Sequence, residues 1–159
     1  MRAAYLSLLL LLPGCATRSG ADRGDGDRHS TSDRSGPSAA AWWSSYRDFM
    51  LLSARIARSG SATVLSVGVE LKALSSEPEA YVQMKELVLE VREIFPGHLT
   101  YSANWDEAET VGFWDLVDFA GVNGYYPLEP DPLRGAEAVA RRLSALSRRA
   151  GREVLILEV

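Results

Sequence analysis

Two glutamates each follow an apolar run that predicts a buried strand. Glu70 ends the run Thr63–Val69, and Glu158 ends the predicted strand Glu153–Glu158. Runs with so little polar alternation are typical of parallel sheets covered by helices, in which the carboxyl ends of the strands form the edge where ligands bind. Two carboxylates at one such edge can serve as proton donor and as nucleophile or base, which is the chemistry of glycoside hydrolysis. We therefore expect Glu70 and Glu158 to form a catalytic pair.

Polar and aromatic side chains also follow the two other predicted strands, which we place at Leu99–Asn104 and Phe119–Asn123. A purely structural sheet has no reason to collect such residues at one edge, so the pattern favours a functional site. The side chains at this edge that we select as candidate site residues are Asn104, Trp105, Tyr125 and Tyr126. The competing interpretation is structural, because glutamates often end strands simply where loops meet water, and Tyr126 could be a core aromatic.

The segments before each strand have the apolar periodicity of helices. A first helix is expected around Trp43–Ala57, and a second opens at the capping box Ser76–Glu79. A short helix is predicted over Glu107–Leu116, and a last one ends at Gly151. The alternation of helices and strands predicts an α/β fold with parallel strands joined by right-handed crossovers.

Composition limits the chain to one modest domain, which we place at residues 39–159. The sequence has 159 residues, 47% of them apolar, and a formal net charge of -4. Its 17 lysines and arginines are scattered among acidic neighbours and form no basic face with interleaved aromatics, so we expect no nucleic-acid partner.

The amino terminus has the layout of a bacterial lipoprotein leader. Residues 1–14 contain Arg2, an apolar core too short to span a bilayer, and Pro13 before Gly14, as in a secretory signal. Leu12–Cys15 resembles the lipobox, in which the cysteine is acylated, and Cys15 is the single cysteine of the chain. Residues 15–38 are almost free of apolar side chains and predict a disordered tether. We expect a protein anchored to the bacterial envelope, at the outer membrane or cell surface, or else secreted. The alternative is an ordinary helix start with an incidental cysteine.

Four segments resemble the central part of glycoside hydrolase family 113, a family of retaining (β/α)8-barrel β-mannanases. They are Val67–Leu74, Tyr101–Asp106, Phe113–Asp115 and Gly121–Leu128. The resemblance implies that Glu70 is the acid/base at the end of the fourth barrel strand and that Glu158 is the nucleophile at the end of the seventh. It implies that Tyr125 hydrogen-bonds the nucleophile and that Asn104 and Trp105 line the sugar cleft. It implies mannan-type polysaccharide or oligosaccharide as substrate, and no metal or organic cofactor.

By the same resemblance, the chain corresponds to barrel strands four to seven with their helices. Strands one to three and strand eight have no counterpart in the sequence, so we expect a partial (β/α)8 barrel that is incomplete as given. Open sheet edges predict self-association and an inactive monomer. Two other functions stay open: a non-catalytic surface lipoprotein that binds glycans, and a non-functional gene fragment.

Overall fold

The computed structural model describes residues 37–127 and 130–158, with side chains described from residue 39 onward. The predicted signal peptide, Cys15 and the predicted tether as far as residue 36 lie outside the described residues. None of the described helices is both long enough and apolar enough to cross a membrane.

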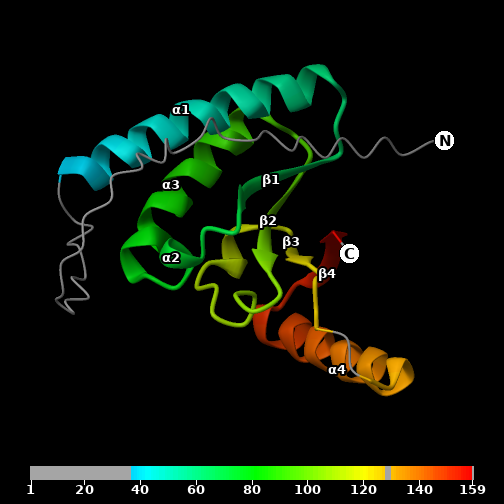
Figure 1. The fold of residues 1–159 in the computed structure, drawn as a ribbon. Coiled ribbons are helices and arrows are strands. Elements are labelled where there is room, and N and C mark those ends of the chain that lie inside the picture. Colours follow the sequence, from blue (N-terminus) through cyan, green and yellow to red (C-terminus); the bar gives the residue numbers. More distant parts are fainter. Residues whose placement is uncertain (1–36, 128–129, 159) are drawn as a thin grey trace, which may run out of the picture.

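The described residues form one sheet of four parallel strands, covered by helices (Figure 1). The strands are β1 (Val64–Val69), β2 (His98–Asn104), β3 (Phe119–Asn123) and β4 (Glu153–Glu158). The helices are α1 (Pro37–Ser59), α2 (Lys72–Ser75), α3 (Pro78–Ile94) and α4 (Pro132–Ala150), with a short 3-10 helix, η1 (Trp114–Leu116). The order β1-β2-β3-β4 adds each new strand to the same edge, which is the winding of a (β/α)8 barrel. The α/β class and the partial barrel predicted from the sequence are confirmed.

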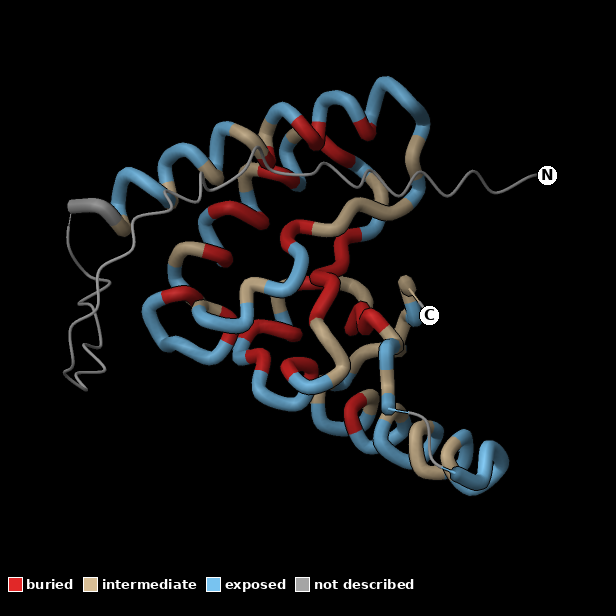
Figure 2. Tube along the Cα trace, viewed as in Figure 1, coloured by how far each residue is buried: buried red, intermediate tan, exposed pale blue. Residues whose placement is uncertain are grey.

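The hydrophobic core lies between the sheet and its helices. Val67, Leu99, Tyr101 and Val122 are fully buried on the strands. Figure 2 shows buried segments along the sheet and on the inner sides of α1 and α3, whereas most of α4 is exposed. Burial of large apolar side chains against α1 and α3 is the main stabilising contribution to this half of the barrel.

The opposite face of the sheet carries small and polar side chains on β1 and β2 and the aromatic Phe119 on β3. The register pairs Ser66 with Thr100 and Thr100 with Phe119, so these residues share a face. Ser66 Oγ lies 2.8 Å from Ser102 Oγ on this face. In β1 only Val67 and Gly68 are buried, so the first strand is less buried than its apolar run predicted. Val69 is 55% exposed at the end of β1.

Two local predictions also differ from the structure. Ser76 does not cap α3, because it already ends the short helix α2; the residue before α3 is Glu77, whose side chain makes no capping hydrogen bond. The helix predicted over Glu107–Leu116 is instead a series of turns followed by η1. Glu107, at the start of this segment, is 0% exposed, so it does not lie on a solvent-facing helix surface.

Gly121 in β3 allows the close approach of β2 that this sheet needs. A Cβ at this position would lie 2.5 Å from Tyr101 O and 2.6 Å from Thr100 Oγ1. Gly121→Ala should therefore lower the free energy of unfolding by about 1–3 kcal/mol, measured by urea denaturation. Gly112→Ala is the control, because its nearest neighbour would be Ser75 O at an ordinary 3.6 Å. Equal losses in the two variants would contradict this account of the packing.

Candidate active site

Glu70 lies directly after β1, at the carboxyl end of the sheet. Its backbone adopts a left-handed conformation with φ of 49°, unusual for a residue other than glycine. Its N–H donates to Ser102 O on β2 at 2.9 Å. Its Oε1 accepts a hydrogen bond of 3.0 Å from Nδ2 of Asn123, the last residue of β3. The backbone of Glu70 is thus tied to β2, and its carboxylate is tied to the end of β3.

Glu158 ends β4 and is held by the residues that follow β3. Tyr125 Oη donates to Glu158 Oε2 at 2.7 Å, and Gly124 N–H donates to the Glu158 carbonyl oxygen at 2.6 Å. The hydrogen bond to Glu158 raises the pKa of Tyr125, with smaller contributions from partial burial and from the charges of Glu158 and Glu70. The tyrosine therefore stays a proton donor at neutral pH.

Asn123 joins the two carboxylates into one site. It pairs with Glu158 in the sheet register and donates its side-chain amide to Glu70. The negative charges of both glutamates also act on the Tyr125 hydroxyl. The structure thus brings together three of the residues predicted from the sequence, namely Glu70, Glu158 and Tyr125, at the carboxyl ends of β1, β3 and β4. We call this end of the sheet the carboxyl rim.

Asn123 is a site residue that the sequence analysis missed. It is 2% exposed, and within the described residues its Oδ1 is buried without a hydrogen-bond partner. Because an ionised carboxylate can only accept, the Nδ2 group faces Glu70, and Oδ1 is the buried atom left without a partner. The signal was present in the sequence, since Asn123 ends its strand as Asn104 ends β2.

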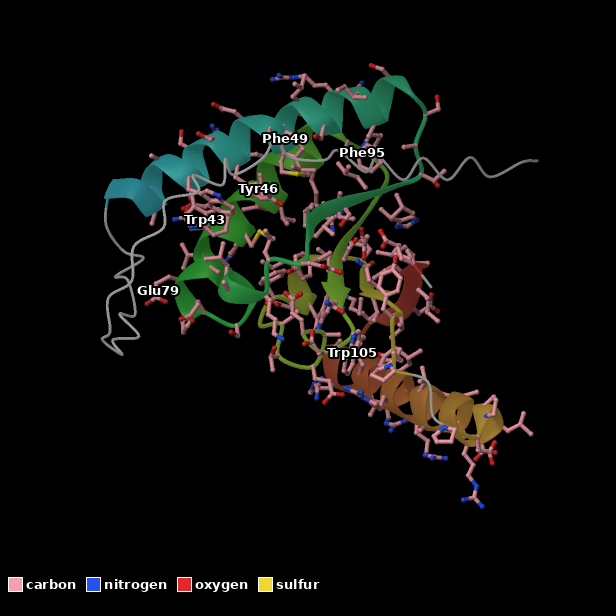
Figure 3. The ribbon with its side chains drawn as sticks, viewed as in Figure 1. Trp43, Tyr46, Phe49, Glu79, Phe95 and Trp105 are labelled. Atoms are coloured by element: carbon pink, nitrogen blue, oxygen red, sulfur yellow. The ribbon has the colours of Figure 1, made fainter. Side chains whose placement is uncertain are left out.

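Trp105 and Tyr126 contact each other. Their ring centroids are 5.7 Å apart, and the Arg142 guanidinium on α4 lies 5.6 Å and 5.3 Å from the two rings. Arg142 also forms an ion pair of 2.9 Å with Glu109. Figure 3 shows Trp105 at the side of the sheet nearest α4. One face of each ring is therefore occupied by a cation, and only the remaining surface can contact a sugar.

The side chain of Asn104 makes a local contact. Its Oδ1 accepts the Trp105 N–H at 2.7 Å, which shapes the turn after β2. Beside this turn, Lys72 Nζ lies 2.5 Å from Asp106 Oδ2 and links the loops after β1 and β2. Both ion-pair partners are well exposed, so the pair contributes little to stability.

Two further observations bear on other kinds of site. In residues 37–127 and 130–158, no group of three or more His, Cys, Asp or Glu side chains could hold a metal ion. A groove between α1 and α3 is lined by Trp43, Arg47, Glu79 and Gln83. Figure 3 shows Trp43 and Glu79 on the helical layer, so this groove is distinct from the carboxyl rim.

Comparisons with known proteins are consistent with this geometry. The chain matches the family model of Glycoside Hydrolase Family 113 over residues 7–159. It is similar to the structure of the GH113 beta-mannanase AaManA from Alicyclobacillus acidocaldarius in complex with ManMIm, with a TM-score of 0.67 and 24% identity over 79% of this chain and 38% of that one. A complex structure of a GH113 beta-1,4-mannanase gives a TM-score of 0.66 and 23% identity over 82% of this chain and 40% of that one. The chain thus spans 38 to 40% of the length of these structures, and the likeness shows the fold. No curated protein matches the chain.

Asn123→Asp tests the contact between Asn123 and Glu70. Two carboxylates about 3 Å apart cannot both ionise, so the folded variant would retain a proton that the unfolded chain releases near pH 4. Because the folded state then binds more protons, the free energy of unfolding should fall by about 1–3 kcal/mol as pH rises from about 4 to 7, relative to the wild type. Urea denaturation across this pH range measures the effect.

Asn104→Asp provides the matched control for this experiment. Asn104 Oδ1 accepts a backbone N–H, a role that a carboxylate can also fill. A pH profile of Asn123→Asp that runs parallel to those of the control and the wild type would show that the Asn123–Glu70 contact is not formed.

Proposed function

Because the chain belongs to glycoside hydrolase family 113, we propose that its carboxyl rim carries out retaining hydrolysis of β-mannosidic bonds. The observation that carries the proposal is the pair of held carboxylates: Tyr125 donates to Glu158, and Asn123 donates to Glu70. One carboxylate is therefore oriented by a phenol and the other by a buried amide, so both side chains are held at the carboxyl rim.

In the proposed reaction, Glu158 attacks the anomeric carbon while Glu70 gives its proton to the departing glycosidic oxygen. Tyr125 holds Glu158 Oε2, so Oε1 is the oxygen that bonds to the sugar. The bond from the anomeric carbon to the leaving oxygen breaks as the glycosyl-enzyme ester forms. Glu70 then takes a proton from water, whose oxygen attacks the anomeric carbon and releases Glu158. The configuration at the anomeric carbon is retained after two inversions.

The substrate we infer is a mannan-type chain. The structures similar to this protein are of beta-mannanases, one of them in complex with ManMIm. The open surfaces of Trp105 and Tyr126 can contact the apolar face of a sugar ring. These groups suit an oligosaccharide better than a small charged metabolite.

A glycan-binding protein without turnover is the second candidate. Four described strands cannot close a barrel, and β1 and β4 each have an edge that pairs with no other strand in the described part of the chain. These edges favour association with further strands, including those of a second copy. Binding of mannooligosaccharides without product release, measured on the chain itself, distinguishes this candidate from an enzyme.

Substitutions of the two glutamates should affect turnover differently. The test uses a protein in which the remaining barrel strands are supplied from a matched mannanase. Glu158→Gln should abolish turnover of every substrate, because no glycosyl-enzyme ester can form. Glu70→Gln should lower kcat/KM on mannooligosaccharides about 10²–10⁴-fold, yet spare an aryl β-mannoside whose leaving group needs no proton. Steady-state kinetics on both substrates measure this contrast. Equal losses on both substrates in both variants would reject the assigned roles.

We also propose that acylated Cys15 anchors the protein to the bacterial envelope. The support is the order of charge, apolar core and Leu12–Cys15 at the amino terminus. More than one acyl chain is needed for durable attachment. Cys15→Ser should therefore move the protein from the membrane fraction to the soluble fraction, as measured by fractionation and immunoblotting. A wild-type protein that is soluble and keeps an unmodified Met1 would contradict the anchor.

A further inference from the structure

The backbone of Glu70 is held in an unfavourable conformation. Residues other than glycine adopt φ near 49° at a cost in free energy. They keep this conformation only where their surroundings impose it. Among the described residues, the other example is Ser61 in the turn after α1. Contacts around Glu70 must therefore impose this conformation.

Both peptide groups that flank Glu70 are fixed by β2. The N–H of Glu70 donates to Ser102 O at 2.9 Å. The N–H of Leu71, the next residue, donates to the hydroxyl of Tyr101 at 2.7 Å. The first is an ordinary backbone hydrogen bond between neighbouring strands. In the second the acceptor is a side-chain oxygen, so this hydrogen bond depends on a tyrosine at position 101.

Tyr101 is itself tightly constrained. It is 0% exposed, and its ring packs against Phe113 and Trp114 at centroid distances of 5.0 Å and 5.9 Å. Gly68 makes room for it, since a Cβ there would lie 3.0 Å from the ring. Burial raises the pKa of Tyr101, and the hydrogen bond to Glu107 raises it further, so the hydroxyl remains protonated.

Glu107 completes this chain of contacts. It is 0% exposed, and its Oε1 accepts the Tyr101 hydroxyl at 2.5 Å. Its Oε2 accepts the N–H of Asn104 at 3.2 Å. Because the Tyr101 O–H donates its hydrogen bond to Glu107, the hydroxyl oxygen can accept a hydrogen bond from the Leu71 N–H. A buried carboxylate with two hydrogen bonds therefore fixes the orientation of the tyrosine.

We propose that Tyr101 and Glu107 are positioning residues, which act through the Leu71 peptide group to hold Glu70 in place beside Asn123. The inference rests on the proposed function in that Glu70 is taken as the acid/base. Loss of the Tyr101 hydroxyl leaves the Leu71 N–H without its acceptor. The Glu70 backbone can then relax from φ of 49° toward the ordinary regions, and this rotation carries the carboxylate away from Asn123.

The test uses Tyr101→Phe in the full chain, studied by NMR. Exchange of the Leu71 amide hydrogen should become at least about tenfold faster than in the wild type, after correction for any change in global stability. The side-chain amide resonances of Asn123 should move toward their position in Glu70→Ala. The Glu70 amide hydrogen, which donates to Ser102, reports whether the sheet itself is intact.

Tyr46→Phe is the matched control. Its hydroxyl is also largely buried and also contacts β1, where it donates to Val67 O at 2.9 Å. A general loss of stability would affect both variants alike, whereas positioning requires a change at Leu71 and Asn123 in Tyr101→Phe alone. Unchanged Leu71 exchange and Asn123 resonances in Tyr101→Phe, or equal changes in Tyr46→Phe, would overturn the proposal.

A second variant covers the case in which Tyr101→Phe does not fold. Removing the hydroxyl leaves the buried Glu107 carboxylate short of one partner, which is strongly destabilising. The double variant Tyr101→Phe/Glu107→Gln removes that charge and keeps an acceptor for the Asn104 N–H, and it should give the same changes at Leu71 and Asn123. Failure of the proposed function can be told apart from failure of the positioning proposal. If the proposed function is wrong, Glu70→Gln and Glu158→Gln will spare turnover in the completed barrel. The NMR results on Tyr101→Phe test the positioning of Glu70 in either case.

Discussion

Parallel pairing of the strands in chain order is the constraint on which the rest of the structure depends. It places the carboxyl end of every strand at one edge, so residues far apart in sequence become neighbours. Glu70 after β1 and Glu158 at the end of β4 are linked in this way through Asn123 and Tyr125 at the end of β3. The placement of the candidate site residues therefore follows from the sheet topology, and the loops determine only how each side chain is oriented.

The sequence predicted those features that depend on local pattern. The bounds of β3 agree with the structure because an apolar run ends there in Asn123. The predicted helix over Glu107–Leu116 was wrong, because an acidic residue in a helical pattern is normally placed in solvent, whereas Glu107 is buried with Tyr101 as its partner. A contact between two elements leaves no trace in the periodicity of either one.

The aromatic residues illustrate the same limit. Trp105 and Tyr126 were expected at the rim as independent contacts for a sugar. Their common partner Arg142 lies on α4, far along the chain, and its ion pair with Glu109 connects that helix to the turn after β2. The residue types pointed to the correct edge of the sheet, but how much of each ring is open depends on a cation from another element.

The left-handed backbone of Glu70 has a consequence for how this position can evolve. Glycine and asparagine adopt such a conformation more readily than glutamate, so substitution to either would relieve strain at this point in the fold. Selection for stability alone would thus remove the carboxylate. Under the acid/base role proposed for Glu70, residue 70 is a place where activity and stability favour different amino acids.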